Sequence, residues 1–245
     1  MKQDKKLNPP ITLSIVSHGN INEVIELLCS ILLIDYIFID KLILTINKKE
    51  DLSSFRNLVL PFKKTIITNS FVKGFGENHN NAFKLCNTEL FLVLNPDIKF
   101  PKNFSFSKII NIKKNNNSSV ISPYIKTDNK IVYPRAFPSI FNYLINKKKY
   151  FSHGEIYVDW ISGSFMLFNS SIFRKIQGFD EQFFLYMEDI DICRKLKLIN
   201  HSVSVDITQY VIHKARRLSH QNLQHFFFHF SGIYKYYKKI ILEYL

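Results

Sequence analysis

The residues Leu90 to Leu94 read Leu-Phe-Leu-Val-Leu, a run without a polar side chain. A strand with apolar residues on both faces is typical of the buried interior of a parallel sheet, where helices cover both sides. The run stops at Asn95-Pro96-Asp97, and Pro96 has no N–H to continue the pairing. We therefore expect a central strand that is covered on both faces.

Other apolar runs before this strand alternate with segments of helical periodicity. Strands are expected at Ile11–Ser17, Lys41–Ile46 and Thr65–Thr68, and helices at Ile21–Leu33 and Glu77–Cys86. This alternation is typical of an α/β fold with a Rossmann-like, mostly parallel central sheet flanked by helices. In such sheets, ligands bind beyond the carboxyl ends of the strands.

The second half of the chain has a different pattern, with no internal repeat and no clear linker. We expect a solvated turn at Lys113–Ser118, a hairpin of Val120–Ile125 with Lys130–Tyr133, and a basic loop at Asn146–Tyr150. A long strand at Tyr157–Phe168 and an acidic helix at Glu188–Leu198 follow. Two short strands, Val203–Val205 and Tyr210–Ile212, complete the sheet. A C-terminal amphipathic helix is expected from the spacing of Leu223, Phe227, Phe230, Tyr234, Tyr237 and Ile241.

The composition allows one large domain or two small ones, because 46% of the 245 residues are hydrophobic. The net charge of +13 favours polyanionic partners, namely nucleic acid, an acidic membrane face or a phosphate-bearing ligand. The abundance of Lys, Asn, Ile and Phe also fits an AT-rich genome, so charge alone does not choose among these partners.

The cysteines and the N-terminus indicate a cytoplasmic protein. Cys29, Cys86 and Cys193 are odd in number and lack CxxC spacing, which suits buried thiols in a reducing compartment. The basic segment Met1–Pro10 leads into no signal-peptide core, and no apolar run reaches the length of a membrane span. We expect a cytoplasmic location, with peripheral contact with the inner membrane left open.

Acids and aromatic rings are concentrated between Gly178 and Asp191, which reads Gly-Phe-Asp-Glu-Gln-Phe-Phe-Leu-Tyr-Met-Glu-Asp-Ile-Asp. Carboxylates beside apolar rings are suited to hold a general base near neutral pH. The segment is therefore the first candidate for an active site.

Five segments in this order resemble the inverting family 2 glycosyltransferases of the GT-A fold, most of all the bacterial rhamnosyltransferase-like enzymes that build surface polysaccharides. They are Ser14–Asn20, Gly74–Ala82, Leu94–Asp97, Trp160–Met166 and Gly178–Asp191. The resemblance runs from about Ile11 to His213 and implies a single GT-A domain. Residues 1–100 would form the nucleotide-sugar-binding half, residues 101–218 the acceptor and catalytic half, and residues 219–245 the C-terminal helix.

The resemblance implies a divalent cation, Mg²⁺ or Mn²⁺, held by Asp97 and His213. Asp97 lies where the family places its metal-binding acid, and the cation would bridge the donor diphosphate and offset its charge. The alternatives are an ordinary Asn-Pro-Asp turn and a histidine that caps a strand or packs in the core.

The resemblance also gives roles to the acids of the Glu188 segment. Asp189 would be the base that takes the proton of the acceptor hydroxyl, and Glu188 would orient the acceptor or the base. Asp191 is placed on the acceptor side, although acids in a first helical turn also serve simple helix electrostatics.

Donor-binding residues are implied at the strand ends and in the glycine-rich turn. They are Ser17, His18, Asn47, Gly74, His79, Asn80, Asn95 and Arg216. Two places depart from the common family pattern, because His18-Gly19 stands where relatives carry Tyr-Asn or similar, and Asn47 stands where many carry Asp. The glycine turn is not a Rossmann fingerprint, since GxGxxG spacing is absent, and its alternative is a turn with a helix N-cap.

Aromatic residues offer an acceptor platform, because sugars pack their C–H faces on rings. The candidate rings are Trp160, Phe179, Phe183, Phe184 and Tyr186; Trp160 is the preferred acceptor contact, whereas most of the phenylalanines are expected in the core. The aromatic stripe of the C-terminal helix is expected in the core or, with its lysines, on an anionic membrane surface.

The resemblance therefore implies a metal-dependent transferase that moves a sugar, with rhamnose as the first candidate, onto a hydroxyl of a growing capsular or lipopolysaccharide glycan. Its partners would be a nucleoside-diphosphate sugar and a glycan or lipid-linked glycan, with no nucleic acid. One alternative is a nucleotidyltransferase, which would want a phosphate loop that Ser14–Asn20 does not supply. The other is a non-catalytic basic domain that binds RNA or anionic glycan.

Overall fold

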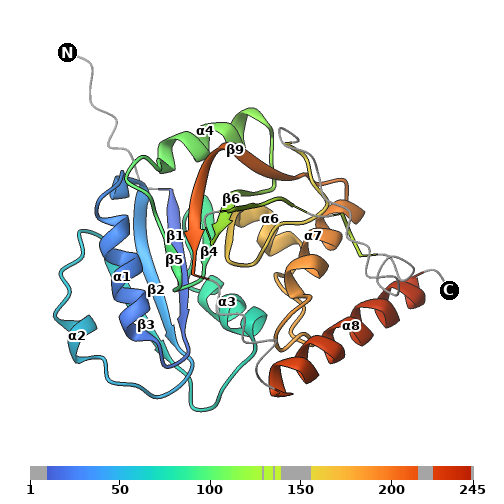
Figure 1. The fold of residues 1–245 in the computed structure, drawn as a ribbon, viewed down its shortest axis with the longest axis horizontal. Helices are drawn as coiled ribbons and strands as arrows, with labels where there is room; N and C mark the ends of the chain where they lie inside the picture. The colour runs from blue at the N-terminus through green and yellow to red at the C-terminus, as the bar shows by residue number, and fades with distance from the viewer. Residues whose placement is uncertain (1–9, 129, 135, 139–155, 215–222, 244–245) are drawn as a thin grey trace.

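The computed structural model describes residues 10–128, 130–134, 136–138, 156–214 and 223–243. Among them, nine strands form one curled sheet in the order β3-β2-β1-β4-β8-β6-β9-β5, and β7 pairs with β6 beside this path (Figure 1). The strands are β1 (Ile11–Ser17), β2 (Ile39–Ile46), β3 (Lys63–Thr68), β4 (Leu90–Leu94), β5 (Ile98–Lys99), β6 (Val120–Thr127), β7 (Lys130–Val132), β8 (Phe165–Asn169) and β9 (Val203–His213).

Helices cover both faces of this sheet. They are α1 (Ile21–Ile31), the 3₁₀ turn η1 (Tyr36–Phe38), α2 (Ser53–Arg56), α3 (Phe75–Phe83), α4 (Phe106–Asn115), α6 (Ser170–Lys175), α7 (Glu188–Leu198) and α8 (Leu223–Glu243). One hydrophobic cluster lies under α1, α2 and α4, and the second lies under α3, α6, α7 and α8. The fold is thus the α/β arrangement with a mostly parallel first half that the sequence predicts.

The strand β4 is central and covered on both faces, as its sequence predicts. It pairs in parallel with β1 and antiparallel with β8, and all five of its residues are buried. Leu90, Leu92 and Leu94 point into the first cluster, while Phe91 and Val93 point into the second. The period of two thus divides one apolar run between the two cores.

The predicted long strand Tyr157–Phe168 is wrong over most of its length, because only β8 at its end is a strand. Tyr157 makes one isolated bridge to Ser204, and the chain then turns through Gly163. The N–H of Gly163 donates to Asp189 Oδ2 (3.1 Å) rather than to a neighbouring strand. The Asp189 side chain therefore accepts the hydrogen bond that the carbonyl of a neighbouring strand would accept in a sheet.

The two short strands predicted after α7 are one strand, β9, which pairs in parallel with β6. The register shifts between Pro123 and Tyr124, so Asp206 and Tyr210 oppose neighbouring residues of β6. Pro123 has no N–H to donate, which favours a bulge at this point.

The predicted solvated turn Lys113–Ser118 begins inside the helix α4, which was not predicted although Phe106, Ile109 and Ile110 have helical spacing. Asp35, distant in sequence, accepts hydrogen bonds from the N–H groups of Phe106 and Ser107 at 2.7 and 2.9 Å and so stabilises the helix start. Lys113 is buried and donates to the carbonyl of Ser118, and burial lowers the pKa of its ammonium group to about 7.

The cysteines partly differ from expectation, because Cys86 and Cys193 are buried free thiols whereas Cys29 is exposed. The predicted basic loop Asn146–Tyr150 lies outside the described residues. Within the described part of the chain, no helix has the length and apolarity that crossing a bilayer requires.

Candidate active site

A cavity of about 580 Å³ lies between the β6–β7 hairpin, the segment Trp160–Ser162 and the N-terminus of α7. Trp160, Asp189 and His213 all line it. Trp160 lies in the segment before β8, Asp189 lies in the first turn of α7, and His213 ends β9. The fold thus gathers three of the predicted site residues around one space.

His213 connects this cavity to Asp97. Its Nε2 atom is 3.1 Å from Asp97 Oδ2, and the other carboxylate oxygen of Asp97 is buried with no hydrogen-bond partner. Antiparallel pairing of β5 with β9 sets Ile98 opposite His213, so the turn after β4 meets the end of β9. The N–H of Lys214 donates to the carbonyl of Asp97 at 3.0 Å and closes this contact.

The two candidate carboxylates line different cavities. Asp97 faces a second cavity of about 380 Å³, which lies against α1, whereas Asp189 faces the larger one. His213 lines the larger cavity and contacts Asp97, so the imidazole stands between the two acids.

An imidazole and an unpaired carboxylate oxygen fit a divalent cation, since Mg²⁺ and Mn²⁺ commonly take one or two protein ligands and complete their shell with substrate phosphates and water. In the described residues, no three His, Cys, Asp or Glu side chains are grouped as a complete protein-only site. Asp97 and His213 would therefore hold the cation only together with another ligand such as a diphosphate.

Asp189 is oriented by main-chain donors. Its Oδ2 accepts from Gly163 N–H (3.1 Å), and its Oδ1 accepts from the N–H of Ile190 (2.9 Å). The chain enters α7 through Tyr186 and Met187, which both have left-handed backbone angles (φ 71° and 73°). These angles turn the helix start, with its positive dipole end, toward the cavity.

Glu188, next to Asp189, is buried, and its Oε2 has no hydrogen-bond partner. Burial, and then the negative charge of Asp189, raise the pKa of Glu188 well above its usual value. Glu188 is therefore a protonated, neutral acid across a wider pH range than an ordinary glutamate.

Asp191 faces α8, which contradicts its predicted place on the acceptor side. It is 1% exposed, and its Oδ1 accepts from Lys239 Nζ at 2.7 Å. Lys239 also contacts Asp180 Oδ2 at 2.9 Å. Burial raises the pKa of Asp191, while Lys239 opposes this rise, so the residue anchors two helices to each other.

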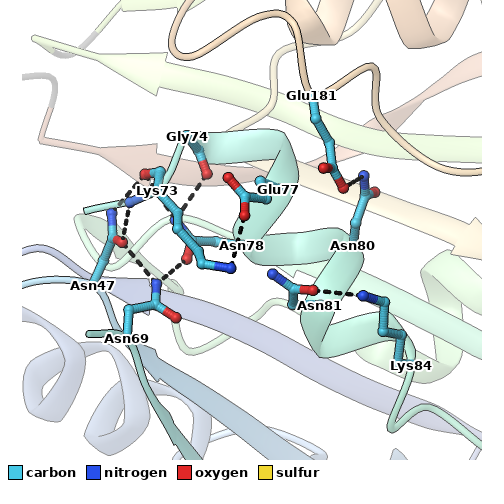
Figure 2. Close-up of polar contacts among 10 residues, drawn as sticks. All are labelled: Asn47, Asn69, Lys73, Gly74, Glu77, Asn78, Asn80, Asn81, Lys84 and Glu181. Atoms are coloured by element: carbon cyan, nitrogen blue, oxygen red, sulfur yellow. Dashed lines mark hydrogen bonds and ion pairs between the residues drawn. The ribbon is translucent and has the colours of Figure 1, made fainter. Parts of the chain in front are cut away.

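Four predicted donor residues, Ser17, His18, Asn47 and Gly74, gather beyond the carboxyl ends of β1 and β2. Asn47 Oδ1 accepts from the N–H of Lys73 (2.8 Å), and its Nδ2 donates to the carbonyl of Lys73 (2.9 Å) and to His18 Nδ1 (3.1 Å), as Figure 2 shows in part. Asn69 Nδ2 donates to the same Oδ1 at 2.8 Å. The Asn47 amide therefore holds the chain before α3 in place.

His18 is exposed at this edge, and Ser17 beneath it is buried. Partial burial, and then the Lys48 ammonium, lower the pKa of His18. Gly74 begins α3 with no room for a side chain, because a Cβ there would lie 2.9 Å from the carbonyl oxygen of Phe184. The absence of a side chain at Gly74 lets the main chain at Phe184 lie close to the start of α3.

His79 and Asn80 lie away from that edge, contrary to their predicted donor contacts. His79 is 1% exposed, its Nδ1 is 2.8 Å from Ser14 Oγ, and burial lowers its pKa to about 3. Asn80 pairs with the main chain of Phe179, and its Nδ2 also donates to Glu181 (Figure 2). The polar atoms of both side chains contact protein groups, and His79 is buried whereas Asn80 is half-buried.

The remaining predicted residues lie near the cavity or outside the described chain. Asn95 N–H donates to the carbonyl of Ser164 (3.0 Å), which ties the end of β4 to the segment that carries Trp160. Trp160 is 9% exposed, and its Nε1 donates to the carbonyl of Ala136 (3.3 Å). Phe179 and Phe183 are buried as expected, and Arg216 lies outside the described residues.

No family model matches the chain. It is 29% identical over 195 residues to the rhamnosyltransferase WbbL of Escherichia coli K12, a match that covers 71% of this chain and 70% of that protein. A 78-residue stretch, 31% of this chain and 25% of the relative, is 36% identical to the N-acetylglucosaminyl-diphospho-decaprenol L-rhamnosyltransferase of Mycobacterium tuberculosis.

The fold is similar to that of the mannosyltransferase PcManGT from Pyrobaculum calidifontis, solved with GDP-Man and Mn²⁺. The TM-score is 0.65 at 12% identity, and the match covers 88% of this chain and 60% of that one. The chain is a glycosyltransferase with the GT-A fold, and its sequence is similar to that of rhamnosyltransferases. Its relatives support a role in sugar transfer for polysaccharide biosynthesis.

The β6–β7 hairpin gives this glycosyltransferase cavity residues that sequence reasoning missed. Tyr124 and Tyr133 pack edge to face across the hairpin, with ring centroids 5.7 Å apart, and both line the cavity with Ser162. The predicted hairpin was the available signal, because it pairs these two tyrosines. No local motif connects the hairpin to Asp189, so only the fold assigns it to the site.

Proposed function

We propose that this chain transfers a sugar, with rhamnose as the first candidate, from a nucleoside diphosphate to a hydroxyl of a growing bacterial surface polysaccharide, a capsule or a lipopolysaccharide. The reaction is a single displacement that inverts the anomeric carbon. One observation carries this proposal: Asp189, Trp160 and His213 line one cavity, and His213 contacts Asp97.

Asp189 is the base in this proposal. The N–H groups of Gly163 and Ile190 donate to its carboxylate and orient it at the wall of the cavity. Asp189 takes the hydroxyl proton as the oxygen attacks the anomeric carbon, and the bond from that carbon to the diphosphate oxygen breaks. General base catalysis of this kind contributes roughly 10²- to 10⁴-fold to the rate.

Asp97 and His213 bind a divalent cation together with the donor diphosphate. When bound, Mg²⁺ or Mn²⁺ neutralises charge on the departing diphosphate. The buried, unpaired Oδ1 of Asp97 supports this assignment, because a buried acceptor without a partner is costly unless a ligand binds it. Mn²⁺ in the related mannosyltransferase structure is consistent with it.

The donor base and ribose bind at the edge formed by Ser17, His18 and Gly74, while Asn95 lies between this edge and the acceptor cavity. Asn47 holds the Lys73–Gly74 turn for them, and the sugar acceptor packs on Trp160. We also propose one GT-A domain, with residues 1–100 as the donor half, 101–218 as the acceptor half and 219–245 as the C-terminal helix.

A donor screen tests the function. UDP-, dTDP- and GDP-linked sugars are titrated by calorimetry with Mn²⁺ and with a chelator, and donor hydrolysis and transfer to lipid-linked glycans are followed by mass spectrometry. We expect one donor to bind in a Mn²⁺-dependent way, and proton NMR of the product to show inversion. A product with retained anomeric configuration would contradict the single-displacement mechanism.

The net charge of +13 also favours a second function, binding of RNA or anionic glycan without catalysis. Salt-sensitive RNA binding, with no donor hydrolysis under any cation, would support that reading and contradict the first.

A further inference from the structure

The helix α8 displays an aromatic ridge, which we define as Phe226, Phe227, Phe230, Tyr234, Ile241 and Leu242. Their exposed fractions are 59, 66, 65, 62, 50 and 61%. The spacing of these residues sets them on one face of the helix. Large apolar side chains grouped in this way on a surface commonly mark a binding face for a protein or a membrane.

The opposite face of α8 is firmly held. Tyr236 and Ile233 are buried in the second hydrophobic cluster, and Lys239 contacts Asp191 and Asp180. A Cβ at Gly232 would lie 2.9 Å from the carbonyl oxygen of Tyr186, so this turn of α8 lies against the chain that leads into α7. The orientation of α8 is therefore fixed by its buried face, and the ridge points outward as a consequence of the packing.

The positive charge of the lysines beside the ridge, and of the chain as a whole, favours an anionic partner. Lys238 is exposed among the ridge residues, and Lys235 lies beside them with its ammonium on the carbonyl of Gln182 (2.7 Å). The chain carries a net charge of +13, so two copies meeting at this face would repel each other. Anionic lipid headgroups attract the same charges, and acyl chains receive aromatic rings.

We propose that the aromatic ridge of α8 inserts into the interface of an anionic lipid bilayer, with the helix lying along the membrane plane. One face of the 21-residue helix α8 packs on the protein and the other exposes the ridge and Lys238, which suits a helix that lies in the interface, and among the described residues no helix could cross the membrane. Because α8 also anchors Asp191 of α7, the bilayer would hold the start of α7, and with it Asp189, at a set height above the headgroups. This inference does not depend on the sugar-transfer proposal.

Vesicle sedimentation tests the inference with the full chain. Vesicles of phosphatidylcholine alone are compared with vesicles that also contain phosphatidylglycerol, at low and at high salt. We expect binding to the mixed vesicles, weakened by salt. The double variant Phe227→Ser/Phe230→Ser should lose at least about tenfold in partitioning, because two rings no longer enter the bilayer.

The matched control is Ile37→Ser/Val59→Ser, which removes two side chains that are 65 and 86% exposed, one in η1 and one in the segment after α2. Figure 1 shows α2 and α8 on opposite sides of the molecule. The control should bind as the parent does. Equal binding by both double variants, or no binding of the parent to anionic vesicles, would overturn the inference. A stable dimer that only the ridge variant disrupts would also overturn it, because the ridge would then serve self-association.

A second measurement leaves the ridge apolar and so avoids loss of folding. Phe230→Trp adds an indole to a chain that has one tryptophan, Trp160, which is 9% exposed. Brominated lipids in anionic vesicles should quench the new fluorescence, whereas Val59→Trp should remain unquenched. Equal quenching of the two variants would contradict insertion of the ridge.

Discussion

Asn80 pairs its side-chain amide with the main chain of Phe179, ninety-nine positions further along the chain: the Phe179 N–H donates to Oδ1 at 2.9 Å, and Nδ2 donates to the Phe179 carbonyl at 2.9 Å. Asn47 makes the same pair of bonds with Lys73, at 2.8 and 2.9 Å. Each amide thus substitutes for a peptide group of a neighbouring strand. The two asparagines thus tie the segments that carry Lys73 and Phe179 to distant parts of the chain.

Asn80→Ala should lower the free energy of unfolding by about 1–3 kcal/mol, because it leaves the N–H and carbonyl of Phe179 without partners. Urea denaturation measures this change. The control is Asn81→Ala on the same helix, where the amide contacts only the exposed Lys84 and little change is expected (Figure 2). Equal losses for the two variants would show that the Phe179 pairing contributes nothing specific.

Asp189→Asn should reduce kcat by roughly 10²- to 10⁴-fold, because the amide cannot accept the acceptor proton. Donor affinity should persist, since Asn keeps an oxygen for the Gly163 or Ile190 N–H. Steady-state transfer assays and donor titration measure the two effects. Asp40→Asn, which removes a surface partner of Lys63, serves as the control and should leave kcat unchanged. Near-normal turnover by Asp189→Asn would refute its role as the base.

Asp97→Asn and His213→Gln should each abolish the Mn²⁺-dependent part of nucleoside-diphosphate binding, because each removes one of two protein ligands. Calorimetry with Mn²⁺ and with a chelator measures this part directly. The exposed turn residue Asp51, changed to Asn, should retain the full Mn²⁺ effect. If Asp97→Asn also retained it, the cation would bind elsewhere.

Glu188→Gln should stabilise the protein increasingly as pH rises. The pKa of Glu188 is raised well above 4.5 in the folded state, so the folded chain holds a proton that the unfolded chain releases. The parent therefore loses stability as pH rises above the unfolded pKa, until the folded pKa is passed, and glutamine removes this loss. Guanidinium unfolding between about pH 4.5 and pH 8 measures the difference, which should be small at the acid end. A difference that does not change with pH would contradict the assignment.

Lys239→Met should destabilise the fold strongly, by roughly 3–5 kcal/mol, because it leaves the buried Asp191 without its cation. Lowering the pH should recover part of the loss, since a protonated Asp191 needs no partner. Thermal and urea unfolding measure both effects. Lys238→Met, one residue earlier and exposed, is the control and should change stability little. A loss that does not recover in acid would point away from the Asp191 carboxylate.

Local sequence features predicted much of the framework. The apolar run Leu90–Leu94 predicted a doubly covered central strand, and the acids after Met187 predicted the start of α7. These features depend on the alternation of apolar side chains along a strand and on the attraction of acids to the positive N-terminus of a helix. Both effects act over a few residues. The helix α4 was not predicted, although Phe106, Ile109 and Ile110 have helical spacing and Ser105 caps the first turn; the remote Asp35 adds hydrogen bonds that no local pattern shows.

The site itself depended on distant contacts. His79 and Asp191 each sit in a segment that resembles a ligand-binding motif, and both are buried against protein partners, Ser14 and Lys239. No local pattern distinguishes a histidine that faces a cleft from one that faces the core. Burial is decided by which elements pack together, and that information is spread across the chain.

By itself, the sequence determined the strand and helix periods, the points where strands end in polar residues, and the acidic opening of α7. Only the tertiary structure decided that Asp97 meets His213 and that Asp189 faces the cavity while Asp191 faces Lys239. The physical reason is that periodicity sets which face of an element is apolar, whereas the order and direction of strands set which side chains meet. The antiparallel pairing of β5 with β9, which no local residue pattern specifies, brings the imidazole to the carboxylate.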